Sequence, residues 1–190
     1  MESNRLYNIC KVIYTFLVKI IYRPQVVGKE NIPNEGSLIF AGNHRHAVDP
    51  VIVMSNTNRI VHYMAKEELF KGLHGLIFEK IGLIKVHRGR SNPVAVIEAE
   101  NILKNGGTVG IFPEGTRNRT DKKLLKFRHG AVAIAKNTNT KIVPFAITGK
   151  YRIFRKGLKI EFGKPIDFSN MELEEANIYL ENEVLKLLGK

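Results

Sequence analysis

The chain has 190 residues, of which 44% are hydrophobic and 25% are charged, and this composition indicates a folded globular protein and excludes a disordered one. Its 30 lysines and arginines outnumber 18 acidic residues and give a formal net charge of +12. An anionic partner is therefore expected: nucleic acid, an acidic membrane surface or a phosphorylated substrate. The single cysteine, Cys10, excludes an internal disulfide and is typical of a reducing compartment.

Residues 4–23 are predicted to form one amphipathic helix, because apolar residues recur through them at helical spacing and Pro24 follows. The longest stretch of this helix without a charge is 12–18, far short of the ~20 apolar residues that cross a bilayer. Its apolar face is nevertheless wider than a surface helix needs. We therefore expect residues 1–23 to form a separate unit that lies in the interface of an anionic membrane. A helix packed on the protein or in a dimer interface is the alternative.

Positive charge is placed to support such a contact. On this helix, the side chains expected near lipid phosphates and headgroups are Arg5, Lys11, Lys19 and Arg23, with Tyr7, Tyr14 and Tyr22. Basic residues also gather at 122–128 and 150–156, where each would add about 1 kcal/mol of attraction to an anionic leaflet. An ordinary solvated charge run is the alternative for either cluster.

Residues 24–190 are predicted to form a single α/β domain, because runs typical of strands and of helices alternate along them. A short edge strand is predicted at 26–28. Further strands are predicted at 37–42, 60–65, 83–87, 108–112, 142–148 and 158–163, and helices at 50–55, 67–80, 92–104, 128–137 and 171–188. Such alternation is typical of a mixed, largely parallel sheet of about six or seven strands flanked by helices. Ligands of such sheets bind beyond the carboxyl ends of the strands.

The turn from Gly42 to Pro50 links a predicted strand to a predicted helix at that edge of the sheet. It carries His44 and Asp49, which can meet across a turn although residues five apart in a helix point away from each other. A carboxylate beside an imidazole fixes its tautomer and stabilises its protonated form, as a general base for a hydroxyl requires. Two other interpretations stay open. Asp49 could be only the N-cap of the helix, or His44, His46 and Asp49 could bind a metal such as zinc.

Two more strands are followed by charged residues at the same edge. A Pro-Glu-Gly turn after the strand at 108–112 delivers Glu114 and Arg117, and Arg88 follows the strand at 83–87. Guanidinium groups bind phosphate bidentately, so both loops are candidates for a phosphate site. Solvated surface charge is the alternative interpretation of each loop.

Four stretches, in this order, resemble the motifs of the glycerolipid acyltransferase family. They are Asn43-His44 followed by Asp49-Pro50, then Gly82-x-Ile84-x-Val86-x-Arg88, then Phe112-Pro113-Glu114-Gly115-Thr116-Arg117, then Val143-Pro144. The resemblance covers about residues 25–165. Within the family it is strongest to the 1-acylglycerol-3-phosphate acyltransferases. The family fold, a helix-flanked sheet with a membrane-associated amino-terminal part, agrees with the elements predicted above.

The resemblance implies transfer of a fatty acyl group from a thioester, on acyl-CoA or acyl carrier protein, to the free hydroxyl of 1-acylglycerol 3-phosphate. The product would be phosphatidic acid, and neither a metal nor another cofactor is expected. The implied catalytic dyad is His44 and Asp49. The implied substrate-binding residues are Lys66, Arg88, Glu114, Gly115, Thr116, Arg117 and Pro144. Among these, Arg88 and the third motif would hold the acceptor phosphate, and Pro144 would lie on the acyl-chain side.

One departure from the family pattern concerns His46, which stands where the family often has serine. It leaves the acceptor open, so another lyso-phospholipid or lipid acceptor is an alternative. The competing class is a nucleic-acid-binding module, which the charge alone permits. No nucleic-acid partner is expected, because the helices lack one concentrated basic face and the strands lack the aromatic-and-basic pattern of RNA-binding sheets. The expected location is the cytoplasmic face of the cell membrane, with peripheral or monotopic attachment.

Overall fold

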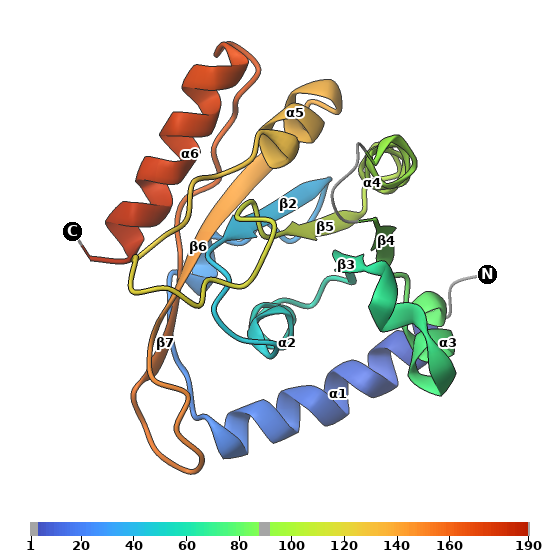
Figure 1. The fold of residues 1–190 in the computed structure, drawn as a ribbon, viewed down its shortest axis with the longest axis vertical. Coiled ribbons are helices and arrows are strands. Elements are labelled where there is room, and N and C mark those ends of the chain that lie inside the picture. The colour runs from blue at the N-terminus through green and yellow to red at the C-terminus, as the bar shows by residue number, and fades with distance from the viewer. Residues whose placement is uncertain (1–3, 88–91, 190) are drawn as a thin grey trace.

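The computed structural model describes residues 4–87 and 92–189, which form one seven-stranded sheet with helices on both faces (Figure 1). The strands are β1 (Gln25–Val27), β2 (Leu38–Gly42), β3 (Val61–Lys66), β4 (Ile84–Val86), β5 (Thr108–Ile111), β6 (Lys141–Gly149) and β7 (Leu158–Phe162). The helices are α1 (Asn4–Ile21), α2 (Asp49–Met54), α3 (Gly72–Lys80), α4 (Pro93–Lys104), α5 (Gly130–Asn137) and α6 (Leu173–Leu187), with short 3-10 helices η1 (Lys29–Asn31) and η2 (Glu67–Phe70).

The strands are hydrogen-bonded in the order β1-β7-β6-β2-β5-β3-β4. Every neighbouring pair is parallel except β6 and β7, so the predicted mixed, largely parallel sheet is confirmed. The single helix predicted at 67–80 is wrong in one respect. Lys71 is extended and Gly72 has a φ of +74°, so the segment divides into η2 and α3. An extended residue cannot continue the helical hydrogen bonds.

The core lies on both faces of the sheet, because the middle strand, β2, is apolar throughout. In β2, Leu38 and Phe40 point to one face and Ile39 and Ala41 to the other, and all four are fully buried. The first face is covered by α1 and α2, and the second by α4, α5 and α6 (Figure 1). The sheet is therefore a rigid, dry platform for the loops at its edge.

Helix α1 packs against α2, which is seen end-on in Figure 1 while α1 runs across the view. Its buried apolar side chains are Tyr7 and Val18. The Tyr7 hydroxyl accepts a hydrogen bond of 2.9 Å from the Val61 N–H, and the Lys11 ammonium donates one of 2.8 Å to the Arg59 carbonyl. Burial raises the pKa of Tyr7 to about 12 and lowers the pKa of Lys11 to about 8. The expectation that these two side chains face lipid headgroups is therefore wrong.

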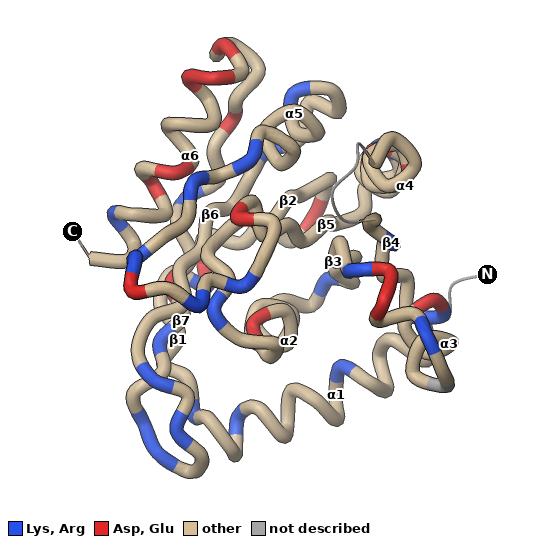
Figure 2. Tube along the Cα trace, in the orientation of Figure 1, with Lys and Arg blue, Asp and Glu red and all other residues tan. Residues whose placement is uncertain are grey.

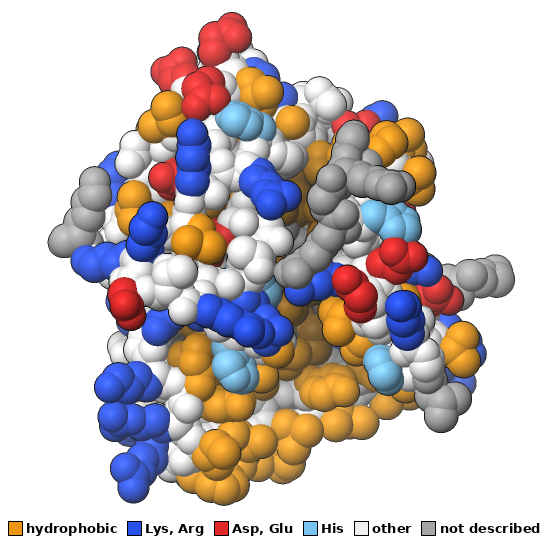
Figure 3. All heavy atoms as spheres, viewed as in Figure 1, with side chains coloured by type: hydrophobic (Ala, Val, Ile, Leu, Met, Phe, Trp, Pro, Cys, Tyr) orange, Lys and Arg blue, Asp and Glu red, His pale blue; other side chains and the backbone are white. Residues whose placement is uncertain are grey.

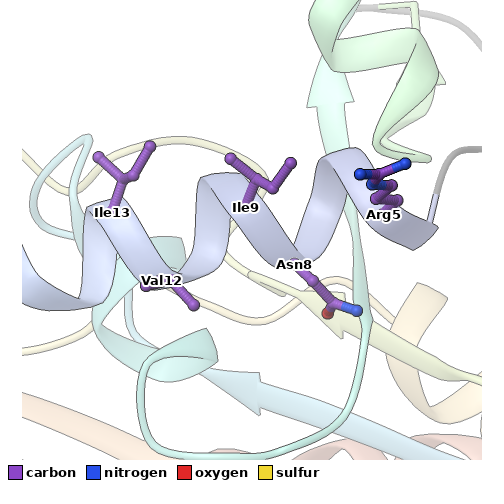
Figure 4. Close-up of a pocket in the computed structure, with 5 residues that line it drawn as sticks. All are labelled: Arg5, Asn8, Ile9, Val12 and Ile13. Carbon is purple, nitrogen blue, oxygen red and sulfur yellow. The ribbon is translucent and has the colours of Figure 1, made fainter.

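The opposite side of α1 is exposed and apolar. Its exposed large hydrophobic side chains are Ile9, Val12, Ile13, Tyr14, Phe16, Leu17 and Ile20. Figure 3 shows a hydrophobic band along this helix, and Figure 4 shows part of it, where Ile9, Val12 and Ile13 line a shallow hollow with Arg5 and Asn8. Within 4–87 and 92–189, no helix is both long and apolar enough to cross a bilayer.

Candidate active site

The side chain of Asn43 sets the point at which the chain leaves β2. Its amide nitrogen donates to the Ile147 carbonyl at 2.9 Å and its amide oxygen accepts from the Ile147 N–H at 2.7 Å. These two bonds extend the β2–β6 pairing by one step after the backbone has turned away. A side chain at Gly42 would collide with Phe145, since a Cβ there would lie 2.2 Å from the Phe145 carbonyl oxygen. His44 therefore starts from a fixed position.

The turn brings His44 and Asp49 into contact, as predicted. His44 Nδ1 lies 2.9 Å from Asp49 Oδ2, and Asp49 is fully buried. The same oxygen accepts backbone N–H bonds from Arg45 at 2.6 Å and His46 at 2.8 Å. The other oxygen, Oδ1, accepts the hydroxyl hydrogen of Tyr151. Four donors thus stabilise the negative charge of the carboxylate.

The prediction that Asp49 is the helix N-cap is wrong by one position. Val48 occupies the cap, and Asp49 is the first residue of α2 with Pro50 in the first turn. The Asp49 side chain reaches back to the preceding loop instead of bonding its own helix. Its carboxylate also lies at the amino-terminal end of the helix, where the backbone N–H groups point.

The His44 ring is oriented by its neighbours. It stacks on Phe112, with ring centroids 4.1 Å apart and an interplanar angle of 24°. An ionised carboxylate can only accept, so the nitrogen facing Asp49 carries the hydrogen and Nε2 is left as the basic atom. The side chain is 18% exposed. Nε2 can therefore take a proton from a hydroxyl that approaches from outside the protein.

Glu114 braces the dyad turn from the neighbouring strand end. Its Oε1 accepts the His44 N–H at 2.6 Å, its Oε2 accepts the Leu125 N–H at 2.9 Å, and the residue is 4% exposed. Desolvation raises the pKa of Glu114, and the two N–H donors oppose that rise. A second tie joins the same loops, because the Asn118 N–H donates to the His44 carbonyl at 2.6 Å. Contact between Glu114 and a substrate stays a prediction.

The rest of the third motif forms the surface next to this brace. Gly115 has a φ of +67°, and a Cβ there would lie 2.8 Å from Arg128 Nε. The Arg128 side chain therefore lies against Gly115, beside exposed Thr116 and half-buried Arg117. In the sequence Arg128 stands only in a basic cluster, because no motif links it to position 115.

The remaining predicted site residues are dispersed. Arg88 lies outside the described residues. Lys66 is the last residue of β3 and is half-buried, at the same edge of the sheet as the dyad turn. Pro144 is buried within β6 opposite Ala41, and its carbonyl accepts the Gly163 N–H at 2.8 Å. Because proline has no N–H to return, the β6–β7 ladder ends there. An acyl-chain role for Pro144 stays a prediction.

Two site residues had no role in the sequence analysis. Phe112 stands in the third motif, and its ring stacks against one face of the His44 ring. Tyr151 lies in the loop after β6 and contacts both Asp49 and His46, with ring centroids of Tyr151 and His46 4.4 Å apart. It is 102 positions from Asp49, so no local pattern could link the two. In the part of the chain that the structure describes, no group of three or more His, Cys, Asp or Glu side chains could hold a metal ion.

Comparisons with known proteins agree on one family. A family model described as Acyltransferase matches residues 23–148. A 1-acyl-sn-glycerol-3-phosphate acyltransferase of Bacillus subtilis is 31% identical over an alignment of 179 residues, and the match covers 90% of this chain and 88% of that protein. Another from Borreliella burgdorferi is 33% identical over an alignment of 149 residues, and that match covers 77% of this chain but only 58% of that protein. The stretch that the family model matches, residues 23–148, contains His44 and Asp49 and ends before Tyr151.

A solved structure shares the architecture. The crystal structure of the 1-acyl-sn-glycerophosphate acyltransferase PlsC from Thermotoga maritima is 27% identical and has a TM-score of 0.74. The similarity covers 96% of this chain and 76% of that one. The chain thus spans most of the Bacillus and Thermotoga proteins and less than two thirds of the Borreliella protein.

Proposed function

Because the chain belongs to the acyltransferase family, we propose that it moves a fatty acyl group from a thioester to the free hydroxyl of 1-acylglycerol 3-phosphate, giving phosphatidic acid. The observation that carries this proposal is the contact between His44 Nδ1 and the buried Asp49 carboxylate, 2.9 Å apart. The named relatives act on the same acceptor. Acyl-CoA and acyl carrier protein are both proposed as donors, since both present the acyl group as a thioester.

The proposed reaction is a direct transfer. His44 Nε2 takes the proton of the acceptor hydroxyl, and Asp49 stabilises the imidazolium that forms. The alkoxide oxygen attacks the thioester carbonyl, so a C–O bond forms and the C–S bond breaks. The imidazolium then returns its proton to the leaving thiolate. The dyad turn, residues 42–50, contains no serine or cysteine, so an acyl-enzyme is not needed.

The acceptor phosphate is proposed to bind beside the third motif. Arg117 follows the Gly115 turn directly, Arg128 packs against that turn, and a guanidinium holds phosphate in a bidentate fork. Arg88, which follows β4 in the sequence, is proposed as a third arginine of this phosphate site. Figure 3 supports a place for the acyl chain, because the surface above α1 is hollowed and its walls are hydrophobic.

The protein is proposed to work on the cytoplasmic face of an anionic membrane, held by α1. Its exposed side is apolar, and Figure 2 shows Lys and Arg gathered on the loop between β6 and β7, next to the end of α1. That loop also exposes Ile153 and Phe154, at 65% and 64%. An apolar face rimmed by positive charge is the pattern that binds anionic bilayers.

One assay tests the reaction. Purified wild-type protein and the variant His44→Ala are incubated with lyso-phospholipids that carry or lack a free phosphate headgroup, each with acyl-CoA or acylated carrier protein. Mass spectrometry should detect phosphatidic acid from wild type, and a rate reduced by about 10²-fold or more in a folded His44→Ala, as loss of a general base requires. Near-normal turnover by His44→Ala would overturn the dyad. If product forms only from other lyso-phospholipids, one of them is the acceptor in place of 1-acylglycerol 3-phosphate.

A further inference from the structure

The loop between β6 and β7 brings a phenol to the side of Asp49 that faces away from His44. Oδ2 of Asp49 contacts His44 Nδ1 and two backbone N–H groups, whereas Oδ1 accepts the Tyr151 hydroxyl. A carboxylate that is hydrogen-bonded at only one oxygen can still rotate about the Cβ–Cγ bond of the aspartate. Bonds at both oxygens fix its plane, and with it the direction in which it meets the imidazole.

The Tyr151 hydroxyl is suited to be a constant donor. Burial first, and then the charge of Asp49 and the hydrogen bond to it, raise the pKa of Tyr151 far above its usual value. The phenol therefore keeps its proton throughout the working range of the enzyme. A lysine or histidine in its place would bring a full positive charge, whereas a neutral phenol directs the carboxylate and withdraws only part of its negative charge through the hydrogen bond.

The Tyr151 ring is itself held from two sides, by the dyad turn and by the end of α1. It stacks on His46 of the dyad turn, with centroids 4.4 Å apart and an interplanar angle of 23°. The Tyr22 ring, just after α1, meets it edge-on at 5.9 Å and 83°. The loop is tied to the same helix end, because the Phe154 N–H donates to the Ile21 carbonyl at 2.6 Å. This packing leaves the hydroxyl little freedom to leave Asp49.

We propose that Tyr151 is a positioning residue for the dyad: its hydroxyl fixes the orientation of the Asp49 carboxylate toward His44 and moderates the negative charge that the imidazole meets. The inference rests on the proposed function, since it concerns the same pair. It also gives the substitution at His46 a use, because a planar ring there supports Tyr151 in a way that a serine could not.

The test is the variant Tyr151→Phe, which keeps the ring and removes the hydroxyl. Without that donor the carboxylate holds more charge for the protonated imidazole, so the acidic limb of the pH–activity profile should move to higher pH. The plateau kcat should fall roughly tenfold, as loss of about 1.4 kcal/mol of transition-state stabilisation requires, with little change in the KM for acceptor. Tyr179→Phe, which changes an exposed tyrosine of α6, is the matched control and should match wild type.

Other charged and titratable groups face the dyad and stay unchanged in this variant. They are the Glu114 carboxylate from the β5 loop, Arg45 and His46 within the turn, and the buried Tyr63 hydroxyl from β3. A difference between Tyr151→Phe and wild type at the acidic limb therefore reports the missing hydroxyl.

A second variant should shift the acidic limb of the pH–activity profile in the opposite direction. Its result does not depend on whether Tyr151→Phe folds. Fluorination of Tyr151 makes the phenol a stronger donor and nearly keeps its shape, so the acidic limb should move to lower pH. The proposed role of Tyr151 is overturned if His44→Ala is inactive and the acidic limb of the pH–activity profile stays in place in both Tyr151 variants. It is likewise overturned if the limb moves in the same direction in both. If His44→Ala stays active, the proposed function fails first, and this inference fails with it.

Discussion

Glu114 accepts the backbone N–H of His44 at 2.6 Å across 70 positions of sequence, and its second oxygen accepts the Leu125 N–H. One buried side chain therefore holds the start of the dyad turn and the far end of the loop after β5. A glutamine at this position has a single acceptor oxygen, so one of the two N–H groups would lose its partner.

We expect Glu114→Gln to lower the free energy of unfolding by about 1–3 kcal/mol, the usual cost of a buried unsatisfied donor, and to lower kcat as the turn loosens. Urea unfolding and steady-state kinetics measure both. Glu175→Gln removes an exposed carboxylate of α6 and is the control. An unchanged stability with a raised KM for acceptor would instead mean that Glu114 binds the substrate, as the motif resemblance implies.

The partly buried Lys11 ammonium should make the free energy of unfolding increase with pH. Burial lowers its pKa to about 8 in the folded protein, from an ordinary value of 10.5. Between these two values the unfolded chain binds more protons, so the free energy of unfolding increases as pH rises. Urea unfolding from pH 7 to 10 should show wild type gaining stability relative to Lys11→Met. Parallel curves for the two proteins would contradict this assignment.

The Tyr7 hydroxyl acts in the opposite direction and in a separate window. Its pKa is raised to about 12 from an ordinary value of 10, so the folded protein binds more protons between these values and loses stability as pH rises. Measurements below pH 10 therefore report Lys11 without this second effect.

Gly115→Ala separates backbone strain from crowding of Arg128. A φ of +67° costs an alanine about 1–2 kcal/mol, and its Cβ would also push the guanidinium away. Gly106→Ala is the matched control, since Gly106 has a φ of +76° and open space around its Cβ position. Both variants should lose stability, whereas only Gly115→Ala should raise the KM for acceptor more than for donor. An equal KM for acceptor in the two variants would mean that Arg128 does not bind the acceptor.

The membrane contact of α1 can be tested with exposed side chains of matched size. Val12 and Ile13 are 70% and 53% exposed on α1, and Val94 and Ile97 are 75% and 57% exposed on α4. Replacing the α1 pair by serine should weaken flotation with anionic vesicles by about tenfold or more, since each buried side chain contributes about 1.5–3 kcal/mol. The serine pair on α4 should float as wild type does. Equal flotation of both variants would mean that α1 is not the lipid-binding face.

Local pattern was sufficient for the sheet and insufficient for the contacts around Asp49. The strands are buried on both faces and show as apolar runs, and the dyad turn follows one of them. The break at Lys71 was missed because an apolar period continues on both sides of it. The Tyr151 contact was missed because it depends on how the β6–β7 loop folds back over α2, which only the assembled sheet determines.

The amide of Asn43 has a consequence for redesign. Since it acts as one more rung of the sheet, the base is anchored to a strand and its acidic partner to a helix, and only residues 45–48 connect the two anchors. Two side chains of that bridge have contacts outside it, since His46 stacks on Tyr151 and Arg45 donates to the Gly149 carbonyl. The exposed position 47 is therefore the place where a library of variants could change the bridge while leaving the proton-transfer machinery intact, provided that the backbone N–H groups of 45 and 46 still reach the carboxylate.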